Sequence, residues 1–188
     1  LEAVTPPKQQ IMASRSFGSL VVDIEDLREA LAHHVSRAAE KLRFQGDEAG
    51  ALTVMIRTNP FKPAEPQYQR TVTLPLATPT SDTLHLIAVA HRILDDLFRP
   101  GFAYHKAGIM LSELRPTTAR QADLFGVPTH DVRRQAAMLA MDEINRKWGR
   151  GTVRASAAGH RAGWQMRRER LSPAYTTSWS DLPTALAL

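Results

Sequence analysis

Hydrophobic positions in the first 114 residues switch repeatedly between helical and strand spacing. Residues 10–17 suit a strand, and a helical stripe then begins after Asp23 and ends before Gly46. The apolar positions of that stripe recur every three or four residues, at Leu27, Leu31, Val35, Ala38 and Leu42. This spacing is typical of an amphipathic helix with one buried side.

The next two segments alternate with a period of two, as strands do. Leu52, Val54 and Ile56 begin the alternation, and residues 68–74 resume it after a proline-rich loop. A second helix is then predicted, capped by Ser81-Asp82 and closed by Pro100-Gly101. We expect its apolar side to comprise Leu84, Ile87, Leu94 and Phe98.

A last strand over residues 104–114 completes the pattern, with Ala107, Ile109 and Leu111 on one side. The order strand, helix, strand, strand, helix, strand predicts an α+β fold. It consists of a four-stranded antiparallel sheet with two helices on one face, and a small helix-containing C-terminal subdomain follows.

Two helices cover one face of such a sheet, so the opposite face must meet water or a partner. Strand parity places hydroxyls, amides and a few cations there, which suit phosphate oxygens without reading bases. The candidate DNA-binding residues are Ser14, Arg15, Ser16, Arg57, Thr71, Thr73 and Lys106. An ordinary solvated sheet surface is also polar, so the pattern alone leaves both interpretations open.

Outside residues 10–114 the chain divides into three further parts. Residues 1–9, with the stiff Pro6-Pro7 pair, are interpreted as a tether from upstream domains. Residues 115–128 have the composition of a linker, and residues 129–188 form a C-terminal extension. In that extension we expect a helix over residues 129–148, with Trp164 and Trp179 clamping the tail onto it. Its apolar side is expected to contain Ala137, Met141, Ile144 and Trp148.

The positive charge of the chain is concentrated in this extension. The formal net charge is +5, and residues 128–188 hold 10 basic and 5 acidic side chains. The predicted basic surface comprises Arg150, Arg154, Arg167, Arg168 and Arg170. Such a surface favours a polyanionic partner, either DNA or an acidic protein.

The sequence offers little for catalysis or metal binding. It has no cysteine, which excludes disulfides and thiolate metal sites and suits a reducing compartment. None of the 7 histidines forms an i, i+4 pair, and neither a nucleophile elbow nor a phosphate-binding glycine loop occurs. We therefore expect no catalytic residue, no metal site and no cofactor in this chain. Charged residues interrupt its longest apolar stretch, which predicts a cytoplasmic protein without a membrane span.

Two other functional classes share this topology. An RNA-binding α/β module would need exposed aromatic residues in the middle of its strands, whereas the predicted face offers methionine, threonine and serine. A small phosphate-ester or acyl-phosphate hydrolase would need an arginine near the first strand, a part that Arg15 would play. The glycine-rich anion loop of such a site is missing.

The pentapeptide from Gln121 to Phe125 places Leu124-Phe125 in an otherwise polar linker. A glutamine followed by two variable residues and two apolar ones can anchor a peptide, the amide at the rim of a pocket and the apolar side chains inside it. Alternatively, Leu124 and Phe125 attach the extension to the sheet domain.

Several segments resemble, in order, the C-terminal part of UmuC-type Y-family DNA polymerases, the catalytic subunit of DNA polymerase V. They are Pro7-Lys8-Gln9-Gln10-Ile11, Ser14-Arg15-Ser16-Phe17-Gly18, residues 38–43, residues 79–83, residues 100–108, residues 121–125 and residues 171–179. The resemblance covers nearly the whole chain.

The resemblance implies a little-finger domain that lays its sheet on DNA near the template-primer junction. A sliding-clamp-binding peptide at Gln121, Leu124 and Phe125 and a C-terminal extension follow it. The resemblance also implies translesion synthesis in the SOS response, with a UmuD-type subunit and RecA as partners. The magnesium-binding carboxylates of such polymerases would lie in upstream domains, so this part would not polymerise.

Overall fold

The computed structural model describes residues 8–119, 132–159, 163–164 and 172–182. The gaps contain most of the predicted linker and three residues of the predicted basic surface. The principal elements are β1 (Ile11–Val21), α1 (Ile24–Gln45), β2 (Asp47–Thr58), β3 (Gln69–Thr80), α2 (Thr83–Leu97), β4 (Tyr104–Pro116) and α3 (Val132–Trp148).

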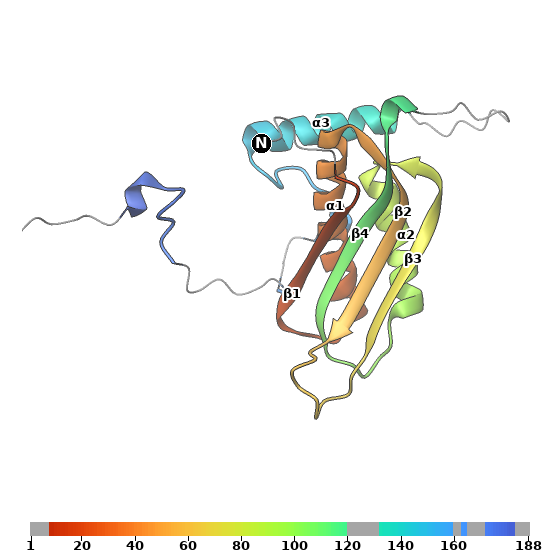
Figure 1. The fold of residues 1–188 in the computed structure, drawn as a ribbon, viewed down its shortest axis with the longest axis vertical. Coiled ribbons are helices and arrows are strands. Elements are labelled where there is room, and N and C mark those ends of the chain that lie inside the picture. Colours follow the sequence, from red (N-terminus) through yellow and green to blue (C-terminus); the bar gives the residue numbers. More distant parts are fainter. Residues whose placement is uncertain (1–7, 120–131, 160–162, 165–171, 183–188) are drawn as a thin grey trace, which may run out of the picture.

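The four strands form one antiparallel sheet in the order β1-β4-β2-β3. Helices α1 and α2 lie on the same face of this sheet (Figure 1). Each strand-helix-strand unit therefore has one strand of the other unit inserted between its own two strands. The predicted α+β fold is confirmed, although β4 continues to Pro116, two residues beyond the predicted boundary.

Helix α1 begins and ends where the sequence predicts. The side chain of Asp23 accepts a hydrogen bond from the Glu25 N–H at 3.0 Å, which satisfies one free donor of the first turn. Gly46 ends the helix at φ 80°, a left-handed conformation that glycine adopts without strain. All five predicted stripe residues are fully buried.

Helix α2 is in the predicted place, but its buried side is different. Leu84 is 49% exposed, so its expected place on the apolar side is wrong. The buried apolar residues of α2 are Leu86, Ile87, Ala90, Ile93, Leu94 and Leu97. Leu86, Ala90, Ile93 and Leu97 follow the helical period, which centres the buried stripe about half a turn away from Leu84.

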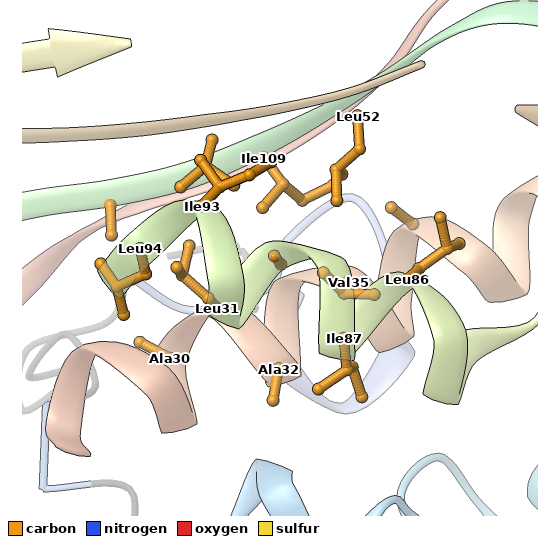
Figure 2. Close-up of a cluster of buried hydrophobic side chains, with 14 of the residues drawn as sticks. Ala30, Leu31, Ala32, Val35, Leu52, Leu86, Ile87, Ile93, Leu94 and Ile109 are labelled. Carbon is orange, nitrogen blue, oxygen red and sulfur yellow. The ribbon is translucent and has the colours of Figure 1, made fainter. Parts of the chain in front are cut away.

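The core fills the space between the helix layer and the sheet. Figure 2 shows Leu31 and Val35 of α1 beside side chains of α2, with Leu52 of β2 and Ile109 of β4 above them. All four residues are fully buried. Burying a leucine or isoleucine side chain contributes about 1.5–3 kcal/mol, so this layer carries most of the stability of the domain.

Helix α3 lies across one end of this sheet and helix arrangement (Figure 1). Its only buried residue in the described segment is Met138, and the expected apolar side through Ile144 and Trp148 is wrong: they are 37% and 70% exposed. The helix is held instead by ion pairs, since Arg43 contacts Asp142 at 2.6 Å and Arg134 contacts Asp82 at 2.6 Å. Polar anchors of this kind leave no hydrophobic period in the sequence.

The predicted clamp of three tryptophans is likewise corrected. Trp179 is 91% exposed, and Trp164 is buried against Phe17 and His33 rather than against α3. The described part of the tail that packs on β1 and α1 consists of residues 155–158 and Trp164. In the described ranges, none of the helices has the length and apolar character that crossing a membrane requires.

Candidate nucleic-acid interface

Three rows of side chains cross the sheet on the side away from α1 and α2, and we call them the open face. Cross-strand register defines the rows as Met12, Met110, Thr53 and Thr73; then Ser14, Gly108, Met55 and Thr71; then Ser16, Lys106, Arg57 and Gln69. Within each row, neighbouring strands place their side chains on the same side of the sheet. Six of the predicted DNA-binding residues lie in these rows, namely Ser14, Ser16, Arg57, Thr71, Thr73 and Lys106.

The third row brings two cations together. Lys106 of β4 is the direct register partner of both Arg57 on β2 and Ser16 on β1. Like charges opposite each other on adjacent strands repel, and the three rows contain no carboxylate to offset the repulsion. This row is therefore the most electropositive part of the open face.

A shallow hollow lies beside these cations and would let an anion reach them. Its lining includes Met55, Arg57, Gln69, Thr71 and Lys106. The Nε of Arg57 is buried and finds no hydrogen-bond acceptor in the described part of the chain. Since an unsatisfied buried donor costs about 1–3 kcal/mol, an anion in the hollow would stabilise this arrangement.

The centre of the open face is flat because β1 and β4 approach closely at Gly108. A Cβ atom at this position would lie 2.3 Å from the Cβ of Ser14. Glycine is therefore required there, and the sequence pattern alone did not show that role. The hydroxyls of Thr53 and Thr73 lie 2.8 Å apart in the next row and fix the pairing of β2 with β3.

One predicted contact residue is on the other side of the sheet. Arg15 is the register partner of Ala107, whose side chain is fully buried beneath the helices. Its neighbours Ser14 and Ser16 lie on the open face, so strand alternation sends Arg15 the opposite way. Its grouping with Arg57 and Lys106 on one face is wrong, and the period-two rule applied to Arg15 itself would have shown this.

The remaining predicted residues are only partly described. Gln121, Leu124 and Phe125 lie outside the described residues, as do Arg167, Arg168 and Arg170. Arg150 and Arg154 are described, and both are exposed. Within the described ranges, histidine, aspartate and glutamate side chains do not gather in groups of three that could hold a metal ion.

Comparison with protein families identifies the sheet domain. The model described as the impB/mucB/samB family C-terminal domain matches residues 8–124. The chain belongs to the impB/mucB/samB family. A second model, a domain of unknown function called DUF4113, matches residues 135–185, which include most of α3 and most of the tail of this family member.

Curated relatives extend the match over almost the whole chain. Protein SamB of Salmonella typhimurium is 43% identical over 185 residues, which cover 98% of this chain and 43% of SamB. Protein UmuC of Salmonella typhimurium strain LT2 is 38% identical over 182 residues, which cover 97% of this chain and 43% of UmuC. This impB/mucB/samB family member thus spans less than half the length of these relatives, and the UmuC-type resemblance is confirmed.

Solved structures give more distant matches. The complex of β-clamp processivity factor and little finger domain of PolIV covers 61% of this chain and 97% of that chain, at 19% identity and a TM-score of 0.41. The insertion ternary complex of Dbh DNA polymerase covers 60% of this chain and 31% of that chain, at 14% identity and a TM-score of 0.44. The family assignment favours neither the RNA-binding nor the hydrolase alternative.

Proposed function

We propose that this chain is the DNA-binding and clamp-targeting C-terminal part of an error-prone translesion DNA polymerase. The observation that carries the proposal is the third row of the open face, where Arg57 and Lys106 lie side by side without a carboxylate. Membership of the impB/mucB/samB family supports it. In this proposal the chain positions DNA, while domains upstream hold magnesium and perform nucleotidyl transfer.

The open face has the chemistry of backbone binding. Its hydroxyls and two cations can donate hydrogen bonds to phosphate oxygens, and in its three rows no aromatic side chain offers a stacking platform. Binding to primed duplex DNA is therefore expected to depend little on sequence and strongly on salt, with micromolar affinity at moderate ionic strength.

The double variant Arg57→Gln/Lys106→Gln tests this face. Fluorescence anisotropy with a labelled primed duplex should show a slope of log K against log salt that is smaller by about two, because two phosphate contacts are lost. The matched control is Arg92→Gln/Arg99→Gln, which removes two exposed arginines, one on α2 and one just after it, and should keep the slope. An unchanged slope in the open-face variant would contradict the proposal.

The clamp-targeting half of the proposal rests on residues 121–125 and on the family. Leu124 and Phe125 would fill the hydrophobic cleft of the replication sliding clamp, and Gln121 would bond at its rim. Alanine at either apolar position should cost roughly 2 kcal/mol of binding free energy, as expected for buried anchors, while Asp123→Ala should change little. Equal clamp affinity of Leu124→Ala/Phe125→Ala and wild type in titration calorimetry would favour the packing alternative.

The wider biology is proposed on the family alone. It comprises action in the SOS response in the cytoplasm, with a UmuD-type subunit and RecA as partners. Co-purification of the full-length polymerase with each partner, with and without residues 129–188, tests whether the C-terminal extension takes part in either contact.

A further inference from the structure

A second group of cations acts electrostatically on His33 of α1, on the helix side of the sheet. It consists of Arg15 from β1, Arg37 from α1 and Arg154 from the tail. Burial lowers the pKa of His33, and the positive charges of Arg37, Arg15 and Arg154 lower it further. The three guanidinium groups, far apart in the sequence, thus act on one half-buried ring.

The docked tail creates this cluster. The indole ring of Trp164 lies 5.6 Å from the His33 ring and 6.2 Å from the Phe17 ring, measured between centroids. The Gly18 N–H donates a hydrogen bond to the Trp164 carbonyl at 3.1 Å. These contacts hold Trp164 across α1 and β1, on the same side of the domain where Arg154, Arg15 and Arg37 all act on His33.

Gly159 suits the same path of the chain over α1. Its φ of 59° is a left-handed conformation that glycine adopts without strain, and a Cβ atom there would displace the flexible end of the Glu29 side chain. Ala155, just before the 3₁₀ turn Ser156–Ala158, and Ala158, at the end of that turn, are buried in the core beside α1. The position of Arg154 is therefore set by its immediate neighbours in the chain.

Among the described residues, none of the three arginines forms an ion pair. Neither Glu29 nor Glu40, the carboxylates of α1 that flank this surface, forms an ion pair with them in the part of the chain that the structure describes. Three cations held near one another repel, and an anion bound among them would offset that repulsion. The planar guanidinium fork matches phosphate oxygens better than a lysine ammonium would.

We propose that Arg15, Arg37 and Arg154 form a second phosphate site, which holds the backbone of a nucleic-acid strand that continues past the open face. The inference rests on the proposed DNA-binding function. Strand β1 is at the edge of the sheet, and Arg15 alternates along it with Ser14 and Ser16 of the open face. A nucleic-acid strand that crosses the third row toward β1 therefore reaches this cluster by turning around the β1 edge of the sheet. The C-terminal extension would thus supply one arginine of the site and the tryptophan that positions it.

Salt-dependent DNA binding of the whole chain tests the site. The variant Arg37→Gln/Arg154→Gln should lose roughly tenfold in affinity for primed duplex at low salt, with a slope smaller by about two. The control Arg92→Gln/Arg99→Gln has the same change in charge and should stay within about twofold of wild type, because mere loss of net positive charge acts weakly. Equal effects of the two double variants would overturn the proposal.

The open-face variant separates this proposal from the one on which it rests. If Arg37→Gln/Arg154→Gln weakens binding and Arg57→Gln/Lys106→Gln does not, the second site stands and the open face fails. The reverse result overturns the second site alone. If neither variant differs from the control, both proposals fail. Circular dichroism of each variant confirms that the sheet domain is folded.

Titration of His33 by NMR, assigned with His33→Gln, provides a readout independent of affinity. A bound phosphodiester beside the ring favours its protonated form, so a short oligonucleotide should raise the pKa of His33. The same titration is run with an acidic peptide of equal charge. A pKa that rises with the peptide and not with the oligonucleotide would assign the cluster to an acidic protein partner and overturn the phosphate site.

Discussion

In the sheet domain two helices and four strands bury continuous apolar surfaces, whereas the C-terminal region is attached through separate anchors. Leu31, Leu52 and Ile109 are fully buried in one shared core. In contrast, α3 buries only Met138 among its described residues and depends on the bidentate contact of Arg43 with Asp142. The tail adds Trp164 as a single large apolar anchor.

The stability of the domain therefore comes from its core, whereas part of its positively charged surface comes from the C-terminal region. The core makes the sheet rigid enough to present the third row of the open face. The anchors add cations at the edge of that sheet without enlarging its core to any great extent. Loss of an anchor should therefore release part of the C-terminal region, while loss of a core side chain should weaken the whole domain.

The largest effect is expected for Leu31→Ala in the core. Removing a fully buried leucine leaves a cavity, and the free energy of unfolding should fall by about 3–4 kcal/mol in urea denaturation. Leu84→Ala is the matched control, since Leu84 is on α2 but 49% exposed, and it should cost under about 0.5 kcal/mol. Similar losses in the two variants would mean that the buried side of α2 includes Leu84 after all.

A slightly smaller loss of stability is expected at acidic pH because of His34, which lies where the core meets the tail. Burial lowers the pKa of His34 to about 4, and the positive charges of His33, Arg15 and Arg37 act in the same direction. The unfolded chain therefore takes up this proton first. Stability contributed by His34 is complete above pH 6.5, the ordinary pKa, and is lost as the pH falls toward 4.

Denaturation of wild type at a series of pH values should show this loss, about 3 kcal/mol between pH 6.5 and 4. His34→Gln should remove that part of the slope, since glutamine does not titrate. His85→Gln, at an exposed position on α2, should retain it. If His34→Gln keeps the wild-type slope, the neutral buried histidine is not the cause.

These tests concern features that sequence could predict to different degrees. The stripe from Leu27 to Leu42 was predictable because burial of one helix side imposes its period. The shift away from Leu84 was not, because several apolar residues of α2 fit more than one helical side. For Arg15, alternation along β1 predicts the helix side of the sheet. It was nevertheless grouped with Ser14 and Ser16, its two neighbours on the open face.

The ion pairs that attach α3 to the domain produce no hydrophobic periodicity in the sequence. Arg43 and Asp142 are 99 positions apart in the sequence, so nothing local connects them. The stripe through Ile144 and Trp148 has helical spacing, yet α3 turns its polar Asp142 toward the domain. Because the His33 cluster joins β1, α1 and the tail, only the docked tail brings its three arginines together.

A moderate effect is expected when the polar anchor of α3 is removed. Asp142→Ala leaves the Arg43 guanidinium, whose side chain is 6% exposed, with only the Ser81 carbonyl and the Thr83 hydroxyl as partners. Such a change should cost about 2 kcal/mol, and hydrogen exchange should become faster in α3 than in the sheet. Asp95→Ala breaks the more exposed pair with Arg28 and should cost less than about 1 kcal/mol. Equal costs would show that α3 does not depend on this ion pair.

The smallest change in stability is expected at the two exposed tryptophans, and it separates the observed tail from the clamp predicted by sequence. Trp148→Phe/Trp179→Phe should alter the free energy of unfolding by less than about 0.5 kcal/mol, since the side chains are 70% and 91% exposed. The double variant retains only Trp164, which is 4% exposed and packed on His33, so its fluorescence should be blue-shifted and resist acrylamide quenching. Trp164→Phe is the complementary control. It retains the two exposed indoles, whose emission should be red-shifted and readily quenched. If Trp148 and Trp179 are instead as protected as Trp164, the tail is clamped onto α3, and Arg154 is no longer held beside Arg15 and Arg37.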